Sequence, residues 1–196
     1  MKKLSTLICL FAILLSSAIS YAQCPPQGSE EADSRLGRIN ILKNRSVTPS
    51  GRHTPLFMQL SDILGDYTGQ DSSRFHNGTY ASTTGYITSY EERGPESCNC
   101  DEASKSAHTG DVHIYIGASP DVPKKECMIV EITPAYKLLH PDYGDKLIKG
   151  NQVKVTGFLL YDFEHKGNSA NTCTSCKLVW RKTCWELHPV TDFTEL

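Results

Sequence analysis

The sequence lacks the motifs that identify the common nucleotide-binding and hydrolytic enzymes. It has no glycine-rich phosphate loop, no Gly-x-Ser-x-Gly nucleophile elbow and no His-Glu-x-x-His metal motif. Internal repeats and low-complexity tracts are missing as well. A function therefore has to be argued from the expected fold and from the faces on which polar side chains fall.

A surplus of positive charge is also missing. Of the 20 basic residues, Lys2 and Lys3 belong to a segment that we expect to be removed, so 18 remain against 22 acidic residues and the net charge is −4. Proteins that bind a phosphate backbone usually show a basic domain or a basic stripe. Strong binding to DNA or RNA is therefore not expected.

Long apolar runs are confined to the start of the chain. Lys2-Lys3, the apolar run Leu7–Leu15 and the small-residue site Ser20–Ala22 predict a secretory signal peptide over residues 1–22. No later stretch is apolar enough to span a bilayer. We expect an exported protein, periplasmic or extracellular. A lipid anchor on Cys24 is less favoured, because the position before a lipidated cysteine is normally small and here it is Gln23.

Seven cysteines follow the signal peptide, and in an exported chain the default for such residues is disulfide pairing. An odd number leaves at least one thiol unpaired or paired with another chain. The disulfide candidates are Cys98, Cys100, Cys127, Cys173, Cys176 and Cys184. A four-thiolate zinc site built from the Cys-x-Cys and Cys-x-x-Cys pairs is the alternative. Outside the cytoplasm, disulfides are favoured over it.

Hydrophobic periodicity predicts two helical patterns followed by strands. The helical patterns cover Glu30–Arg45 and Leu56–Leu64, and a polar surface segment is expected over residues 66–82. The expected strands are Tyr86–Tyr90, Asp111–Ile116, Cys127–Thr133, Gly150–Asp162 and Lys177–Pro189. Residues 135–149, after Pro134, are expected to be partly helical.

Three strands, a helical connection and two more strands are the order of an OB barrel. We therefore predict a mainly β protein, a five-stranded OB-like barrel with a helical N-terminal extension and a helical connection between strands 3 and 4. The extension would span residues 23–82 and the barrel residues 83–196. OB barrels bind oligonucleotides or oligosaccharides on their second and third strands and the adjoining loops.

Seven short pieces of the chain carry a resemblance to a known group. They are Leu42–Arg45, Ser97–Cys100, Asp111–Ile114, Val130–Pro134, Val155–Gly157, Asp162–His165 and Trp185–Thr191. Together they resemble a group of exported bacterial proteins with an OB-like barrel and no assigned activity, over most of the mature chain. The resemblance implies the fold and implies no mechanism. Cys173, Cys176 and Cys184 lie outside the pattern.

Polar side chains are expected on one face of three neighbouring strands, because residues i and i+2 of a strand share a face. Six of them form what we call the polar wall, and His165 closes the fourth strand beside it. The candidate ligand-binding residues are Asp111, His113, Glu131, Thr133, Glu186 and His188 on the wall, with His165. The outer face of a barrel is also polar simply where it meets water, and cross-strand His–Glu pairs stabilise sheets without any ligand.

Three functions stay open at this point. The favoured one is an exported binding module that holds an oligomeric or small ligand on strands 2 and 3 and the adjoining loops. The first alternative is a metal-assisted hydrolase that uses His113, Glu131 and His188 to hold a divalent metal such as zinc. The second alternative is a structural envelope protein without a small ligand. Fold analogy alone cannot decide among them.

Overall fold

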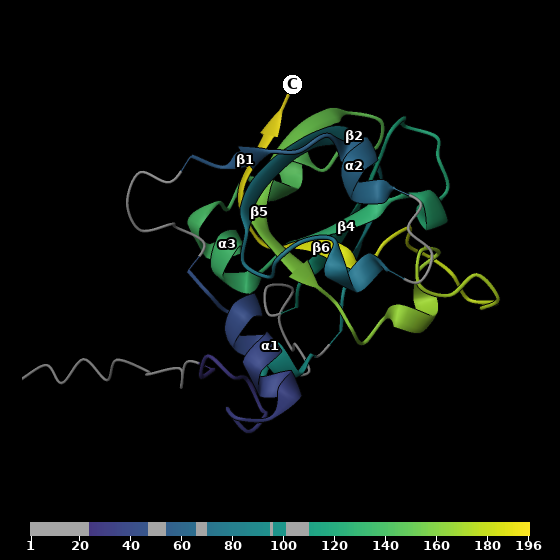
Figure 1. Cartoon of the computed structure of the whole chain (residues 1–196). Helices are drawn as coiled ribbons and strands as arrows, with labels where there is room; N and C mark the ends of the chain where they lie inside the picture. Colours follow the sequence, from purple (N-terminus) through teal and green to yellow (C-terminus); the bar gives the residue numbers. More distant parts are fainter. Residues whose placement is uncertain (1–23, 47–53, 66–69, 95, 101–109) are drawn as a thin grey trace, which may run out of the picture.

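A computed structural model describes residues 24–46, 54–65, 70–94, 96–100 and 110–196 of the chain. The expected signal peptide lies outside these residues. The described residues form one β-sheet that closes into a five-stranded barrel, with one short extra strand and three α-helices around it (Figure 1). The mainly β, OB-like fold predicted from the sequence is confirmed. None of the described helices is long and apolar enough to cross a membrane.

The barrel strands follow one another in a fixed spatial order. They are β2 (Tyr80–Glu92), β3 (Val112–Gly117), β4 (Met128–Ile132), β5 (Gln152–Tyr161) and β6 (Trp185–Glu195). The order around the barrel is β2-β3-β4-β6-β5, and β5 closes it by pairing with β2. Among these five strands all pairings are antiparallel except that of β4 with β6, which is parallel. This arrangement places β3, β4 and β6 side by side, so their outward side chains share one surface.

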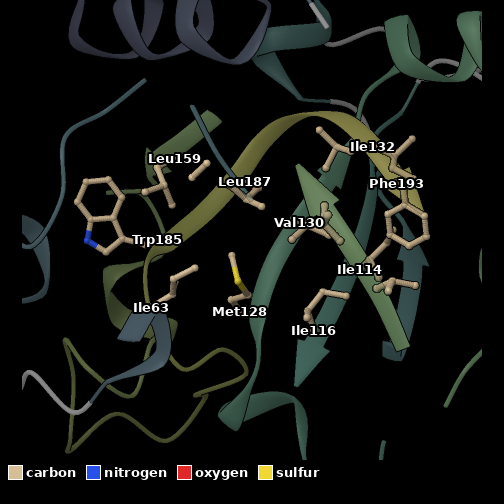
Figure 2. Close-up of a cluster of buried hydrophobic side chains, with 14 of the residues drawn as sticks. Ile63, Ile114, Ile116, Met128, Val130, Ile132, Leu159, Trp185, Leu187 and Phe193 are labelled. Carbon is tan, nitrogen blue, oxygen red and sulfur yellow. The ribbon is translucent and has the colours of Figure 1, made fainter. Parts of the chain in front are cut away.

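The inside of the barrel is filled by the apolar half of each alternating strand. Ile114, Val130 and Leu187 come from three adjacent strands and are fully buried in one cluster (Figure 2). Trp185 and Phe193 lie toward opposite ends of this core. At about 25 cal/mol per Å² of apolar surface, burial of this core is the main stabilising contribution to the fold. It also fixes which side of β3, β4 and β6 faces outward.

Strand β5 is long enough to pair with both β2 and β6, and it changes register against β6 at Gly157. A Cβ atom at this position would lie 2.6 Å from the carbonyl oxygen of Pro189. Only glycine therefore allows the two backbones to approach this closely. The bend that the sequence indicates at this glycine corresponds to a real irregularity of the sheet.

The last strand differs from the prediction. Residues 177–184, which the sequence analysis assigned to it, form no regular strand, and β6 begins at Trp185. The physical reason is a competing set of partners: the Asp71 carboxylate accepts hydrogen bonds from the hydroxyl of Thr183 and from the N–H of Cys184. Asp71 is itself buried, although the sequence placed it in a polar surface segment. These residues tie the β5–β6 connection to the segment before β2.

Two further expectations are corrected at the N-terminal side. Strand β2 begins at Tyr80, inside the segment expected to be a surface loop. Leu56–Phe57 forms the extra strand β1, parallel to β2, instead of the first turn of a helix. The helix that follows, α2, covers only Leu60–Leu64. Backbone pairing with an available strand edge therefore prevailed over a weak helical pattern.

Helices α1 and α3 flank the polar wall. Helix α1 spans Arg35–Lys43, and its N-cap Ser34 accepts a hydrogen bond from the N–H of Gly37. Helix α3 spans Pro134–Leu139 between β4 and β5, where the sequence predicts a helical connection. Proline is at its first position, and the hydroxyl of Thr133 caps it. Helix α1 lies at one side of the barrel together with the short 3-10 turn at 97–99 (Figure 1).

Candidate functional site

The polar wall is buried. Asp111, His113, Glu131, Glu186 and His188 come from β3, β4 and β6 or the residue just before β3, and each is at most 2 % exposed. They point away from the barrel core, as the alternation predicts, but they do not meet water. Contact with solvent is therefore not the reason for the polarity of this face. Burying so many ionisable groups is costly unless they are paired.

Other parts of the chain cover the wall. Lys43 at the end of α1 and the 96–100 segment of the β2–β3 connection lie over one part of it, with Lys43 Nζ 3.5 Å from Glu96 Oε2. The β5–β6 connection lies over another part, where Arg181 reaches Glu186 and Trp180 packs against a small apolar cluster of Tyr115. The surface that OB barrels commonly use for ligands is thus closed by the chain itself.

Glu131 occupies the centre of the cluster. Its Oε1 lies 2.9 Å from Nε2 of His113, which is its direct cross-strand neighbour. Its Oε2 lies 2.8 Å from Nδ1 of His188 on the parallel strand β6. Burial alone would raise the pKa of Glu131, but the two imidazoles hold that pKa well below its usual range. Glu131 is therefore a buried carboxylate between two imidazoles.

Asp111 adds a second carboxylate on the far side of His188. Its Oδ2 lies 3.6 Å from Nε2 of His188, and its Oδ1 accepts a hydrogen bond from the side-chain amide of Asn99. Burial raises the pKa of Asp111 to about 6, although the charge of His188 works against this. Burial would lower the pKa of His188, but the neighbouring Glu131, Glu186 and Asp111 raise it to about 10. The charge of each group therefore changes the pKa of the other.

Several of these close contacts lack the direction of a hydrogen bond. Oδ2 of Asp111, Oε2 of Glu131 and Nδ1 of His188 are buried without an aligned hydrogen-bond partner among the described residues. The distance of 2.8 Å between Glu131 and His188 is short enough for a strong bond, yet the N–H direction does not follow it. Asp111, Glu131 and His188 each offer one ligand atom, and these three atoms lie within 4.8 Å of one another.

One arm of the network runs toward the β5–β6 connection. Arg181 is fully buried and binds Glu186 at 2.9 Å and Asp162 at 2.7 Å. Asp162 also pairs with Nδ1 of His165, so His165 reaches the network through Asp162 and not through the wall. Burial opposes ionisation of Asp162, but His165 and Arg181 hold its pKa well below the usual range. The hydrogen bond with Asp162 raises the pKa of His165 despite burial.

The other arm runs toward α1. The ammonium of Lys43 is buried, and although burial lowers its pKa, the surrounding Glu131, Cys98 and Glu96 raise that pKa well above its ordinary value. Glu96 also lies 3.7 Å from Nε2 of His113. The thiol of Cys98 is buried beside Glu96, and burial raises its pKa strongly. Cys98 is therefore a poor nucleophile in this environment.

We call this set the polar network. Its members are Lys43, Glu96, Asp111, His113, Glu131, Asp162, His165, Arg181, Glu186 and His188. It contains five carboxylates and only two permanent cations. The three imidazoles can supply the missing positive charge only if all of them are protonated. Otherwise a carboxyl group has to be protonated, or another cation has to balance the network.

A hollow of about 510 Å³ opens beside the network, between α1, the 96–100 segment and α3. Its lining includes Lys43, Arg45, Asn99 and Thr133. Thr133 was expected to join the wall, but its hydroxyl caps α3 and the residue lines this hollow instead. The volume falls in the range of sites for small molecules. Thr133 of the candidate ligand set and Lys43 of the polar network both line it.

The cysteines pair differently from the expectation. Cys24, which was not among the named disulfide candidates, forms a disulfide with Cys100, and Cys173 pairs with Cys176. Cys98, Cys127 and Cys184 are buried free thiols, so their place among the disulfide candidates is wrong. The four-thiolate zinc site is excluded by the same pairing.

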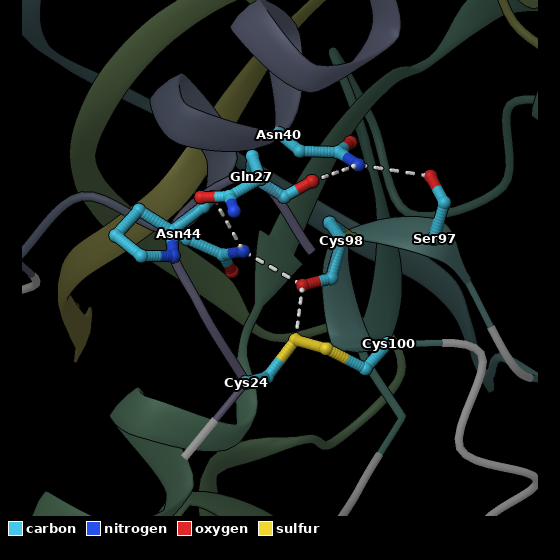
Figure 3. Close-up of a disulfide and its surroundings, with 8 residues drawn as sticks. Cys24, Gln27, Asn40, Asn44, Ser97, Cys98 and Cys100 are labelled. Carbon is cyan, nitrogen blue, oxygen red and sulfur yellow. Dashed lines mark hydrogen bonds between the residues drawn. A yellow bond between two sulfur atoms is a disulfide. The ribbon is translucent and has the colours of Figure 1, made fainter. Parts of the chain in front are cut away.

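The first disulfide joins the start of the described chain to the β2–β3 connection (Figure 3). Asn44 donates to the carbonyl oxygen of Cys98, and Asn40 donates to Gln27 and to Ser97. These bonds fix α1, and therefore Lys43, against the segment that carries Glu96.

Sequence reasoning missed four members of the network: Lys43, Glu96, Asp162 and Arg181. Asp162 belongs to the Asp162–His165 motif, so the sequence could have identified it together with His165. Lys43, Glu96 and Arg181 lie in a helix and in loops, where strand periodicity gives no information about which way a side chain points. A comparison with models of known protein families and another with curated proteins found nothing that matches this chain.

Proposed function

We propose that this chain is an exported OB-like binding module and that its ligand at the polar network is a divalent metal ion. Asp111, Glu131 and His188 would hold the ion through one atom each. The observation that carries the proposal is their convergence: three buried residues, from the start of β3, from β4 and from β6, each offer one ligand atom, and these atoms lie within 4.8 Å of one another. Each of the three residues also has a buried polar atom without an aligned hydrogen-bond partner among the described residues. Two carboxylates and one imidazole suit zinc or a similar divalent ion.

Residues around the three ligands support this assignment. His113 contacts the other oxygen of Glu131, and Asn99 binds the other oxygen of Asp111. Groups in these places fix the orientation of a ligand without touching the ion. His113 therefore moves from the ligand set expected from the sequence to a supporting position, and Asp111 takes its place.

The charge of the network also favours a cation. One divalent ion together with a protonated His165 would balance the five carboxylates with Lys43 and Arg181, leaving His113 and His188 neutral. A neutral His188 is the form that binds a metal. Without an ion, the same balance needs a protonated carboxyl group or positive charge on all three imidazoles in addition to the other two cations.

The test is the metal content of the mature protein. We expect about one zinc-class ion per chain to survive gel filtration and to be removed by a strong chelator. Returning zinc at roughly 100 times its dissociation constant should stabilise the fold by about 2.7 kcal/mol. For a chain of this size that is a rise in melting temperature of roughly 5–11 °C.

The variant Asp111→Asn should lose the ion, because an amide oxygen replaces a charged ligand. Glu91→Gln is the matched control: Glu91 is a carboxylate on β2 that contacts Tyr115 and Lys124 and is no part of the network. No retained metal, together with a melting temperature that zinc and manganese leave unchanged, would refute the proposal.

A metal-assisted hydrolase is the second candidate, and the hollow beside the network favours it. A catalytic ion needs an open position for water or substrate. The hollow reaches Lys43, Asn99 and Thr133, whereas the three ligands themselves are buried. Release of phosphate or carboxylate from model esters by the metal-loaded protein, lost in Asp111→Asn, would support it. A structural role without a ligand would be supported by a metal-free, fully stable protein.

A further inference from the structure

The hollow beside the polar network has a cationic lining. Lys43 and Arg45 both line it, and none of its described lining residues is a carboxylate. This contrasts with the acidic balance of the whole chain. A cavity that gathers positive charge in an acidic protein concentrates anions.

Arg45 is the more informative of the two cations. Its guanidinium is about half-buried and lies 4.6 Å from the centre of the Phe158 ring. Its Nε donates to the carbonyl oxygen of Leu42, but its two terminal nitrogens have no hydrogen-bond partner or carboxylate among the described residues. Partial burial of an unpaired charge is unfavourable, and burial lowers the pKa of Arg45 accordingly. Arg45 lines the hollow, and a planar pair of N–H donors without a partner matches the geometry of an oxyanion.

The neighbours of Arg45 complete a small polar surface. Lys43 precedes it by two residues and lines the same hollow, and its ammonium pairs with Glu96 of the network. Asn99 lines the hollow while its amide nitrogen binds Asp111, one of the three proposed metal ligands. A molecule in the hollow would thus touch Arg45 at one end and approach the proposed ion at the other.

We propose that this hollow binds a small molecule through an oxyanion, a phosphate or carboxylate group, held by the guanidinium of Arg45 with Lys43 beside it. The inference rests on the proposed function in one respect. The uncompensated carboxylates of the network would repel an anion, and a bound divalent ion removes that repulsion. Oxyanion binding should therefore be tighter in the metal-loaded protein than after chelation.

The experiment is calorimetric titration of inorganic phosphate, and separately of acetate, into protein freed of excess metal by gel filtration. The metal content of each sample is measured independently. We expect phosphate or acetate to bind, and Arg45→Gln to weaken that binding roughly tenfold or more. Which anion binds more tightly identifies the group as phosphate or carboxylate.

Arg38→Gln is the matched control, because Arg38 lies on α1, which ends two residues before Arg45, and lines a different hollow. It should leave the affinity within about twofold, a change smaller than one lost charged hydrogen bond would cause. Absence of binding for both anions, or equal affinity in wild type and Arg45→Gln, overturns the inference. Arg45-dependent binding in protein that retains no metal, and whose melting temperature zinc and manganese leave unchanged, would sustain this inference and refute the metal proposal. Retained metal without oxyanion binding would sustain the metal proposal and refute this inference.

Discussion

Glu131→Gln is the most direct perturbation of the polar network. The substitution keeps the shape of the side chain and removes its charge. Glu131 lies 2.9 Å from one imidazole and 2.8 Å from another, and all three residues are at most 2 % exposed. Removing one partner of a buried ion pair costs about 3–5 kcal/mol, because the other charge stays buried without compensation. We expect the free energy of unfolding to fall by that amount at neutral pH.

The measurement is urea and thermal unfolding in the presence of a chelator, so that no metal contributes. For a chain of this length, the expected loss lowers the melting temperature by roughly 6–20 °C. When zinc is returned, wild type should become more stable and Glu131→Gln should not. This second comparison separates a ligand from a group that only stabilises the fold.

Glu91→Gln again provides the control. Its carboxylate is about one-third exposed and pairs with Lys124, so the loss should be about 1 kcal/mol or less. If Glu131→Gln costs no more than Glu91→Gln, Glu131 is not the charge centre of the network and the argument built on its position is wrong.

Three further predictions test other parts of the structure. Gly157→Ala should lower stability by about 1–3 kcal/mol in urea unfolding, since its Cβ would crowd the backbone of Pro189; an unchanged midpoint would contradict the observed approach. Because the pKa of His165 is raised, its pair with Asp162 stabilises the fold fully below about pH 6.5, and this stabilisation is lost as the pH rises through the raised pKa. Because the pKa of Asp162 is lowered, the stabilisation from its carboxylate is full above about pH 3.9 and is lost as the pH falls through the lowered pKa. The deficit of His165→Gln should therefore be largest between these limits, and a pH-independent deficit would count against the pair. Thiol titration of the chain without residues 1–22 should find three reactive cysteines when it is unfolded and almost none when it is folded, because the three free thiols of the described residues are buried; rapid reaction of the native protein would contradict this.

Strand periodicity predicted the barrel well. Alternation in Asp111–Ile116 and in the strand around Glu131 assigned the correct residues to the core and to the outer face. The order of the strands then implied that these outer faces adjoin, and the structure brings His113, Glu131 and His188 within ion-pair distance of one another through Glu131. Such local patterns are reliable because a slip by one residue would expose the whole apolar face.

Burial of the outer face was beyond this reasoning. Periodicity tells which side chains share a face, but not what covers that face. The cover comes from Lys43 on α1 and from Arg181, which are separated from the strands they contact by loops and turns. Disulfide pairing had the same difficulty: the partner of Cys100 is Cys24, 76 residues away, and no spacing rule connects them.

The cover also limits what this face can bind. An open wall on β3 and β4 would suit an oligomeric ligand, as in other OB barrels. Here Glu186 is held under Arg181 and Glu131 lies beneath the Lys43 side of the cover, so no extended molecule reaches the described part of this wall while these contacts persist. The disulfide between Cys24 and Cys100 ties the cover in place. An ion is small enough to lie among the buried ligand atoms. A small molecule fits the hollow beside them. The cover is therefore compatible with these two kinds of ligand and not with an oligomer.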